Sequence, residues 1–337
     1  MSSYKTKSIL HVRIKNFVAW IAPPKETRQT IKDKSDEVRR NIKAEAEKDG
    51  LTIVQMPYSG SFQTRTGLRR SMRGLTPIEG QDIDIPFVVK QDKETEFEPL
   101  IKCFKKYAED AYPNHTIKET KSSVNIEFPD EKLTFDIVPM FETSVAGQQK
   151  LIRNTSEVII TSIEKHKDFI KSRTAKTRKS VGVVTFNDAI RLLKWWNKVY
   201  EAETGKSSNL FSFLINLLGA KAYEMCGDEM TYPQTMANWF SYLAELVRSR
   251  ETIWFDDYYK TPSPDTTKSW NVLDPVMANN NIVKSWAGYE VDELADRFQT
   301  AAEIMNRAII ADLQGRDADS LGHLQLLFGK IFSSHCD

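Results

Sequence analysis

The 337-residue sequence is poor in cysteine and histidine and has almost no net charge. Its cysteines, Cys103, Cys226 and Cys336, are odd in number and far apart, which argues against a disulfide framework and favours a reducing compartment. No Cys/His group has the spacing of a zinc site. With 47 Lys and Arg against 46 Asp and Glu, the net charge of +1 indicates no bulk attraction to a long nucleic acid.

Long apolar runs are also missing. The first residues lack the apolar core of a signal peptide, and no later stretch reaches membrane-spanning length. We therefore expect a cytoplasmic protein with no membrane partner. What is present is ordinary for a globular protein, with 40% hydrophobic and 28% charged residues. A chain of this length buries a substantial core and is predicted to form two lobes.

The most informative stretch runs from Tyr58 to Val88 and reads YSGSFQTRTGLRRSMRGLTPIEGQDIDIPFV. Gly60 lets the backbone come close to an anion, and Ser61 adds a hydroxyl donor where a following helix would offer N–H groups. A basic, helix-like run and a glycine-containing turn come next. This order predicts a loop that binds phosphate.

Carboxylates follow this loop in two strand-like patterns. In QDIDIPFVV the alternating side chains place Asp82 and Asp84 on one face and the isoleucines on the other. Asp136 lies in LTFDIV with the same alternation, so a neighbouring strand would bring all three together. Carboxylates without histidine or thiol favour Mg²⁺ or Mn²⁺, and two such ions can activate a hydroxyl while stabilising a leaving pyrophosphate. The alternative is three turn or strand-end residues on a solvated edge.

Hydrophobic periodicity outlines the remaining elements. The lysines and arginines between 165 and 179 belong to a crossing between lobes, and they are either phosphate-facing or a solvated surface. On the helix that starts near Phe186, the basic residues Arg191, Lys194 and Lys198 are expected on a different side from the buried face. Helices are predicted over 8–22, 24–49, 94–112, 210–225, 232–249, 289–313 and 321–332, a β-rich run over 51–56, and a hairpin from 116–128 and 133–138.

The motifs in this order resemble the nucleotidyltransferase superfamily that includes DNA polymerase beta and the tailing polymerases. GSFQTRT followed by DIDIPFVV is most similar to the branch that holds cyclic GMP-AMP synthase, oligoadenylate synthase and the bacterial CD-NTases. The resemblance implies an α+β fold, with a polymerase-beta-like mixed sheet over residues 1–180, including a spine helix at 25–49. A helical C-terminal lobe would span 181–337, with the active site in the cleft between them. It further implies two Mg²⁺ or Mn²⁺ ions on the three aspartates, and phosphate contacts from Gly60, Ser61 and Thr66. Arg65 stands where several relatives have glycine.

The second half carries its own resemblance. AIRLLKWWNKVY and SNLFSFLINLLGAKAYE look like the paired helices of this branch whose lysine and serine reach the donor triphosphate, which implies Lys194 and Ser212. VLDPVMANNN resembles the LDP segment near the base or ribose, which implies Asp274. The alternatives are a surface lysine and an ordinary Asp-Pro turn. In WFDDYYK, Tyr258 or Tyr259 would stack on a base, although such aromatics are more often core.

The resemblance implies an enzyme that joins two or three nucleoside triphosphates, ATP or GTP or both, into a cyclic di- or trinucleotide with release of pyrophosphate. The product would be a second messenger that switches on a downstream effector in bacterial antiphage signalling of the CBASS type, and no long nucleic acid is required. Two alternatives remain open from the sequence. One is a linear oligoadenylate or tailing polymerase, and the other is a catalytically inactive nucleotide-binding module.

Overall fold

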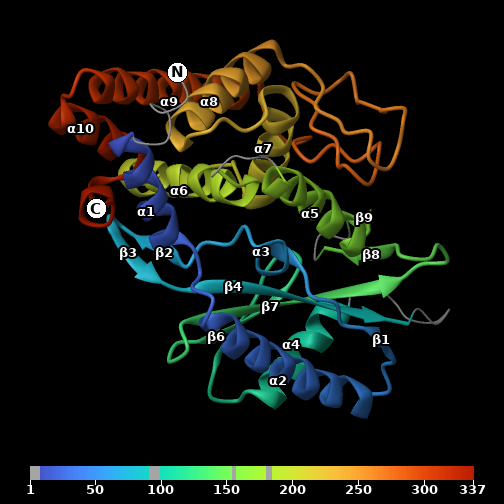
Figure 1. Cartoon of the computed structure of the whole chain (residues 1–337). Helices are drawn as coiled ribbons and strands as arrows, with labels where there is room; N and C mark the ends of the chain where they lie inside the picture. Colours follow the sequence, from blue (N-terminus) through green and yellow to red (C-terminus); the bar gives the residue numbers. More distant parts are fainter. Residues whose placement is uncertain (1–7, 91–98, 154–156, 180–183) are drawn as a thin grey trace. The chain divides into compact units, whose positions relative to one another are not determined.

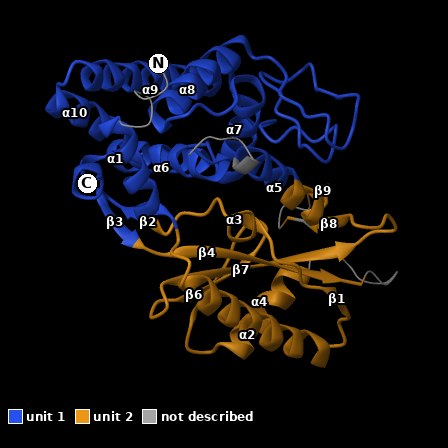
Figure 2. Ribbon diagram, viewed as in Figure 1, with its two compact units in different colours: residues 1–22, 71–78, 169–337 blue, residues 23–70, 79–168 orange. Residues whose placement is uncertain are grey.

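The computed structural model describes residues 8–90, 99–153, 157–179 and 184–337 (Figure 1). By internal contacts the chain forms two compact units (Figure 2). Unit 1 comprises residues 1–22, 71–78 and 169–337, and unit 2 comprises residues 23–70 and 79–168. The predicted lobes 1–180 and 181–337 stay a prediction, since compactness in one structure does not test independent folding.

Unit 2 is built on a mixed sheet with seven strands in the described part of the chain. The strand order is β1-β4-β7-β6-β5, β8 pairs with β7, and β9 pairs with β8. The central strands β4 and β7 are parallel, whereas β6 runs antiparallel to β7. Their bounds are β1 Ile53–Gln55, β4 Gln81–Val89, β5 Thr116–Glu119, β6 Val124–Phe128, β7 Leu133–Glu142, β8 Gln149–Ile152 and β9 Val158–Thr161.

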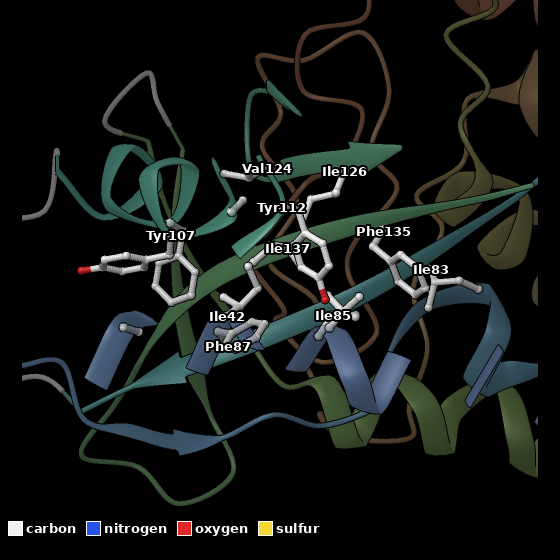
Figure 3. Close-up of a cluster of buried hydrophobic side chains, with 14 of the residues drawn as sticks. Ile42, Ile83, Ile85, Phe87, Tyr107, Tyr112, Val124, Ile126, Phe135 and Ile137 are labelled. Atoms are coloured by element: carbon white, nitrogen blue, oxygen red, sulfur yellow. The ribbon is translucent and has the colours of Figure 1, made fainter. Parts of the chain in front are cut away.

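Two helices, α2 (Thr27–Lys48) and α4 (Pro99–Ala111), pack on each other and on this sheet. The helix predicted over 24–49 is confirmed, and it packs through a narrow stripe in which Ile31, Val38 and Ile42 are all buried. They join the apolar sides of β4, β6 and β7 in one core, where labelled side chains from strands and helices face one another (Figure 3). Burying such side chains is worth roughly 1.5–3 kcal/mol each, so this layer fixes which strand face is left for polar residues.

Unit 1 is mainly helical, and aromatic residues pack in its core. Trp195 is fully buried on α6 and donates its indole N–H to the carbonyl of Phe328 at 2.9 Å. Phe17 of α1 packs edge-on against Trp195, with ring centroids 5.8 Å apart. The helices are α1 Ile9–Ile21, α6 Phe186–Thr204, α7 Ser212–Cys226, α8 Tyr232–Ser249, α9 Gly288–Leu313, α10 Asp317–Phe328 and the 3-10 helix Lys330–Ser334, and α5 (Ile163–Lys179) passes from unit 2 into unit 1.

Several sequence-based expectations about local structure are wrong. The basic run after Thr66 is a hairpin of β2 (Arg70–Arg73) and β3 (Thr76–Glu79), because Gly74 takes the positive φ of 55° that a tight turn uses. Residues 116–128 form two strands, since Thr120 and Ser123 close a turn between them. The crossing predicted at residues 165–179 lies on α5, and the sequence reasoning did not find the strands β8 and β9 that precede it. Residues 94–98 of the predicted helix lie outside the described residues.

The basic face predicted on α6 is also wrong in part. Lys198 is exposed as expected, but Arg191 and Lys194 are 7% and 5% exposed. Periodicity misjudged them because helix α6 is covered on nearly all sides, so its polar residues cannot all reach solvent. Arg191 is paired with Asp188 at 2.7 Å, which offsets part of the cost of burying its charge.

All cysteines carry free thiols. None of the helices in the described part of the chain combines the length and apolar character needed to cross a membrane.

Candidate active site

Two aspartates lie side by side on the central strands of unit 2. In the parallel register of β4 and β7, Asp84 pairs with Asp136, and Asp82 pairs with Thr134. Ile83 and Ile85 are 1% and 0% exposed on the opposite face, where they belong to the core. Alternation along both strands therefore puts Asp82, Asp84 and Asp136 on one polar face, as predicted.

Ser123, in the turn before β6, and Asn125, on β6, hold Asp136 in place. Its Oδ1 accepts hydrogen bonds from Ser123 Oγ at 3.2 Å and from Asn125 Nδ2 at 3.1 Å. Asn125 is the register partner of Asp136 on β6, so its amide lies directly across the strand pair. The sequence reasoning missed both donors. The signal was present in SSVNIEF, where Ser123 and Asn125 alternate with apolar residues.

Gly60 is packed against the carboxylate of Asp84. It has a φ of 64°, and a Cβ added there would lie 1.7 Å from Asp84 Oδ2. No other residue type fits this position without moving the aspartate, which explains why a glycine precedes the serine. Ser61 is half-buried beside it, and its carbonyl accepts from the backbone N–H groups of Thr66 and Gly67 at 3.0 and 3.2 Å. The loop is thus folded back on itself next to the strand face that carries Asp82, Asp84 and Asp136, here called the acidic face.

The helix expected after Gly60 is short. Helix α3 spans only Gly60–Thr64 and ends at Arg65, whose φ of 59° is the left-handed conformation that glycine adopts most easily. Thr66 is fully buried, and its hydroxyl lies 3.0 Å from that of Thr64. These contacts support the loop from within, and a phosphate contact by Thr66 stays a prediction.

Helix α2 anchors the approach to the loop. Tyr58 donates to Asp36 at 2.6 Å, and the guanidinium of Arg39 stacks over the Tyr58 ring at 3.8 Å while pairing with Asp36 at 3.2 Å. Burial and the bond to Asp36 raise the pKa of Tyr58 to about 12, so its hydroxyl keeps the proton it donates. The residues that precede Gly60 are therefore fixed within unit 2.

A metal site is suited by donor type but is not formed by the side chains as they stand. The residues are oxygen donors on adjacent strands, the ligand chemistry that Mg²⁺ prefers. Nevertheless, within residues 8–90, 99–153, 157–179 and 184–337, no group of three or more Asp, Glu, His or Cys side chains is gathered closely enough to hold an ion. The backbone places the three aspartates on one strand face, and ion binding by them stays a prediction.

The remaining predicted residues lie in unit 1. Ser212 is exposed and is the first residue of α7, so the expected position at a helix start is confirmed. Lys194 is buried on α6, which excludes the alternative of a surface lysine. Asp274 is 2% exposed; its Oδ1 accepts from Val276 N at 2.8 Å and its Oδ2 from Asn280 at 3.2 Å. That geometry fits the alternative of an Asp-Pro turn. Nucleotide contacts by these residues stay predictions.

Tyr258 and Tyr259 are half-buried in an irregular segment between α8 and α9. Tyr259 donates its hydroxyl to the Asp274 carbonyl at 3.0 Å, and burial raises its pKa to about 12. Its ring is stacked with that of Trp254, with centroids 6.3 Å apart. Tyr259 therefore helps to hold the segment together, and stacking of Tyr258 or Tyr259 on a base stays a prediction.

Comparison with known proteins supports the resemblance that the motifs indicated. The model of the Second Messenger Oligonucleotide or Dinucleotide Synthetase (SMODS) domain matches residues 10–173. A cyclic AMP-AMP-AMP synthase of Escherichia coli (strain MS 115-1) is 26% identical over 289 residues, which cover 84% of each chain.

The fold is shared with solved structures. E. coli MS115-1 CdnC with ATP has a TM-score of 0.78 at 23% identity, covering 96% of this chain and 98% of that one. The CD-NTase CdnG of Bradyrhizobium diazoefficiens with GTP has a TM-score of 0.73 at 12% identity, covering 99% and 97%. The expected mixed α+β fold with a helical C-terminal part is thus confirmed. Residues 10–173 match the SMODS domain model, and the resemblance to the CD-NTases that the motifs indicated is confirmed.

Proposed function

We propose that this protein is a nucleotidyltransferase that joins two or three nucleoside triphosphates into a cyclic oligonucleotide. The observation that carries the proposal is the arrangement in unit 2. Asp84 and Asp136 are register partners on parallel strands, and the Gly60 backbone lies against the Asp84 carboxylate with Ser61 beside it. A glycine-serine loop next to paired carboxylates is the arrangement that phosphoryl transfer to a hydroxyl requires, because such transfer depends on positioning and on neutralising charge.

The acidic face is the proposed ion site. Asp82, Asp84 and Asp136 would hold Mg²⁺ or Mn²⁺, and two ions are proposed. When bound, they supply a lowered pKa at the acceptor hydroxyl and positive charge at the leaving pyrophosphate. Ser123 and Asn125 keep Asp136 in a fixed orientation. Such support matters because partners that orient ligands tune the affinity of a metal site.

The proposed reaction is the transfer of a nucleotidyl group to a ribose hydroxyl, and this step is repeated. A ribose hydroxyl oxygen of one nucleotide forms a bond to the α-phosphorus of another, the bond between α-phosphorus and bridging oxygen breaks, and pyrophosphate departs. The hydroxyl proton leaves to solvent. The Gly60 backbone and the Ser61 hydroxyl would bind the departing phosphates, and Lys194 would add a positive charge. A final intramolecular transfer closes the ring.

Residues of unit 1 are proposed to bind the nucleotides. Ser212 would donate to a phosphate oxygen from the start of α7. Tyr258 would stack on a base, and Tyr259 with Asp274 would shape the wall next to it. We keep Thr66 as a support of the phosphate loop, because it is fully buried beneath that loop.

Nucleoside triphosphates are the proposed substrates, with ATP the first to test. The curated relative whose alignment covers 84% of each chain is named a cyclic AMP-AMP-AMP synthase, and related structures hold ATP or GTP. CdnC has also been solved with HORMA-deltaN, which supports a search for a protein regulator. By the same relationship, the product would act on a downstream effector in antiphage defence.

One experiment tests the proposal. The purified chain is incubated with the four NTPs and Mg²⁺ or Mn²⁺, and the products are treated with phosphatase. We expect a compact product that resists phosphatase, because a ring has no terminal phosphate. A ladder of lengths would indicate a linear polymerase, and nucleosides alone would indicate an inactive module; either result contradicts the proposal.

A further inference from the structure

The segment that carries Tyr258 and Tyr259 has little regular structure of its own. It follows α8. Among the described residues, the start of this segment forms one isolated β-bridge, between Ile253 and Val272. An irregular loop of this kind needs other contacts to keep its aromatic side chains in one position. Arg173 on α5 makes several of those contacts.

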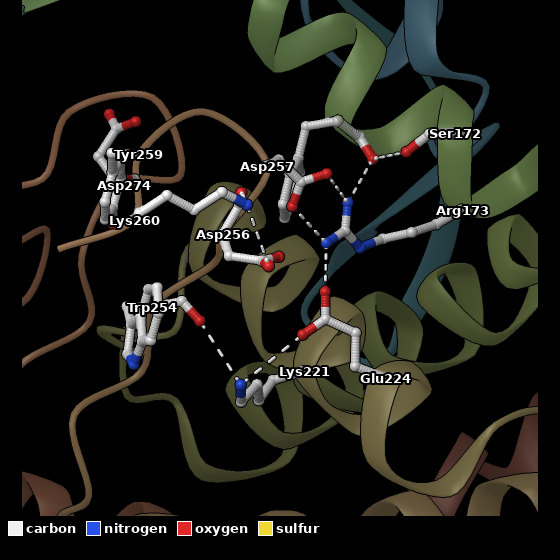
Figure 4. Close-up of polar contacts among 11 residues, drawn as sticks. Ser172, Arg173, Lys221, Glu224, Trp254, Asp256, Asp257, Tyr259, Lys260 and Asp274 are labelled. Carbon is white, nitrogen blue, oxygen red and sulfur yellow. Dashed lines mark hydrogen bonds and ion pairs between the residues drawn. The ribbon is translucent and has the colours of Figure 1, made fainter. Parts of the chain in front are cut away.

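Arg173 forms a fork with the Asp257 carboxylate. Its Nη1 donates to Asp257 Oδ1 at 3.2 Å and its Nη2 donates to Oδ2 at 2.9 Å, so each nitrogen binds one carboxylate oxygen (Figure 4). Nη2 also donates to Glu224 of α7, and Nη1 donates to the Phe169 carbonyl at 2.9 Å. A planar guanidinium alone can reach all of these acceptors at once, which a lysine cannot.

The arginine is enclosed between rings. Its guanidinium stacks over Phe169 at 3.7 Å and lies 5.3 Å from the Phe255 ring, and its side chain is 3% exposed. Phe169 and Phe255 meet edge to face with centroids 4.7 Å apart. The loop is thus attached to α5 through apolar contact as well as through charge.

The charges around Arg173 are balanced by a second cation. Lys221 of α7 lies 3.7 Å from Glu224 Oε2 and donates to the Trp254 carbonyl at 3.5 Å. Arg173 and Lys221 therefore offset the carboxylates of Asp257 and Glu224, which are 26% and 33% exposed. Both cations also hold the loop itself, Arg173 at Asp257 and Lys221 at Trp254.

The attachment reaches the nucleotide-binding residues proposed above. Asp257 immediately precedes Tyr258 in the chain, and Tyr259 connects onward through its hydroxyl to the Asp274 carbonyl. Figure 4 shows Arg173 beside Asp257, with Tyr259 and Asp274 near each other in a separate part of the same view. A shift of the Asp257 carboxylate would therefore be passed to both tyrosines.

We propose that Arg173 is a positioning residue for nucleotide binding, because it fixes the Trp254–Tyr259 segment through Asp257 and Phe255. The inference rests on the proposed function. Because Arg173 acts through the loop, the fork affects the affinity for the nucleoside triphosphate and not the chemical step.

The test is Arg173→Lys, which keeps the charge and removes the fork. We expect the KM for the nucleoside triphosphate to rise about tenfold with kcat changed less than about twofold, the pattern of lost uniform binding. Asp257→Asn should raise KM in the same direction, and the double variant should be no worse than Arg173→Lys alone. Arg248→Lys is the matched control, because Arg248 pairs with Asp296 at an exposed site and should leave KM unchanged.

Hydrogen exchange separates positioning from general stability. In Arg173→Lys we expect faster amide exchange over residues 253–260, with α8 and α9 unchanged. A lower Tm with unchanged KM and uniform exchange would mean a merely structural arginine and would overturn the inference. If the wild-type protein is active and Arg173→Lys has an unchanged KM, this inference alone is overturned. If the wild-type protein neither binds nor joins ATP, the proposed function itself is overturned.

Discussion

The acidic face of unit 2 and the aromatic segment of unit 1 are held in place by different means. On the acidic face, the backbone register of β4 and β7 places Asp84 opposite Asp136. In the aromatic segment, Trp254–Tyr259, side-chain bonds position the residues, as when Arg173 binds Asp257 and Tyr259 binds the Asp274 carbonyl. In the same irregular stretch between α8 and α9, Asn281 joins four neighbouring groups. Regular backbone pairing positions residues whatever their neighbours are, whereas an irregular segment depends on a few specific side chains. Substitutions should therefore act differently in the two regions.

The largest effect is expected from Asp136→Asn. The amide oxygen can still accept from Ser123 and Asn125, so the fold should be kept while the negative charge is lost. Activity should fall at least about a thousandfold, as when a member of a catalytic set is removed. Product formation and the Tm of both proteins are measured, with Asp130→Asn at an exposed turn as control. Turnover near the wild-type level would remove Asp136 from the site.

Gly60→Ala tests the contact between the loop and the acidic face. The new Cβ would lie 1.7 Å from Asp84 Oδ2, so either the loop or the aspartate must move. The positive φ adds about 1 kcal/mol of strain for alanine. We expect activity to fall about a hundredfold, by analogy with the loss of a preorganised group. Gly74→Ala is a matched control, since it has a φ of 55° but nothing within 4 Å of its Cβ. Equal losses in both variants would mean strain alone.

Asn281→Ala should break the irregular part of unit 1. Its side-chain oxygen Oδ1 accepts from the backbone N–H groups of Val272 and Val283 at 3.1 Å each. Its side-chain nitrogen Nδ2 donates to the Trp270 carbonyl at 2.9 Å. Leaving these buried groups unpaired should lower the free energy of unfolding by about 2–4 kcal/mol. The measurement is the denaturation midpoint, with the exposed neighbour Asn279→Ala as control. A midpoint shift no larger than that of the control would contradict the idea that side chains hold this segment.

The same difference explains what the sequence could predict. The period of two in QDIDIPFVV and LTFDIV identified the acidic face, because strand alternation is local information. The alternation in SSVNIEF marks Asn125 as a polar strand residue, but the sequence does not show that Asn125 lies opposite Asp136. That pairing depends on the sheet register. Arg173 and Asp257 lie 84 residues apart in sequence, so only the tertiary fold brings them together. Burial of Arg191 and Lys194 was missed because it depends on what surrounds α6.

The smallest effect is expected from Asn125→Ala, which tests whether the register alone fixes Asp136. The backbone pairing of Asn125 with Asp136 remains, and only the 3.1 Å bond from the amide is lost, with Ser123 still donating to the same oxygen. Activity should fall about tenfold, the lower end for residues that orient a ligand, while the Tm stays within a few degrees. Lys118→Ala is the control on the neighbouring strand, because Lys118 is the register partner of Asn125 but forms only an exposed pair with Glu127. If Asn125→Ala matched that control in activity, backbone register would be sufficient to hold the carboxylate. A loss as large as that of Asp136→Asn would instead mean that the acidic face depends on side-chain support as much as the aromatic segment does.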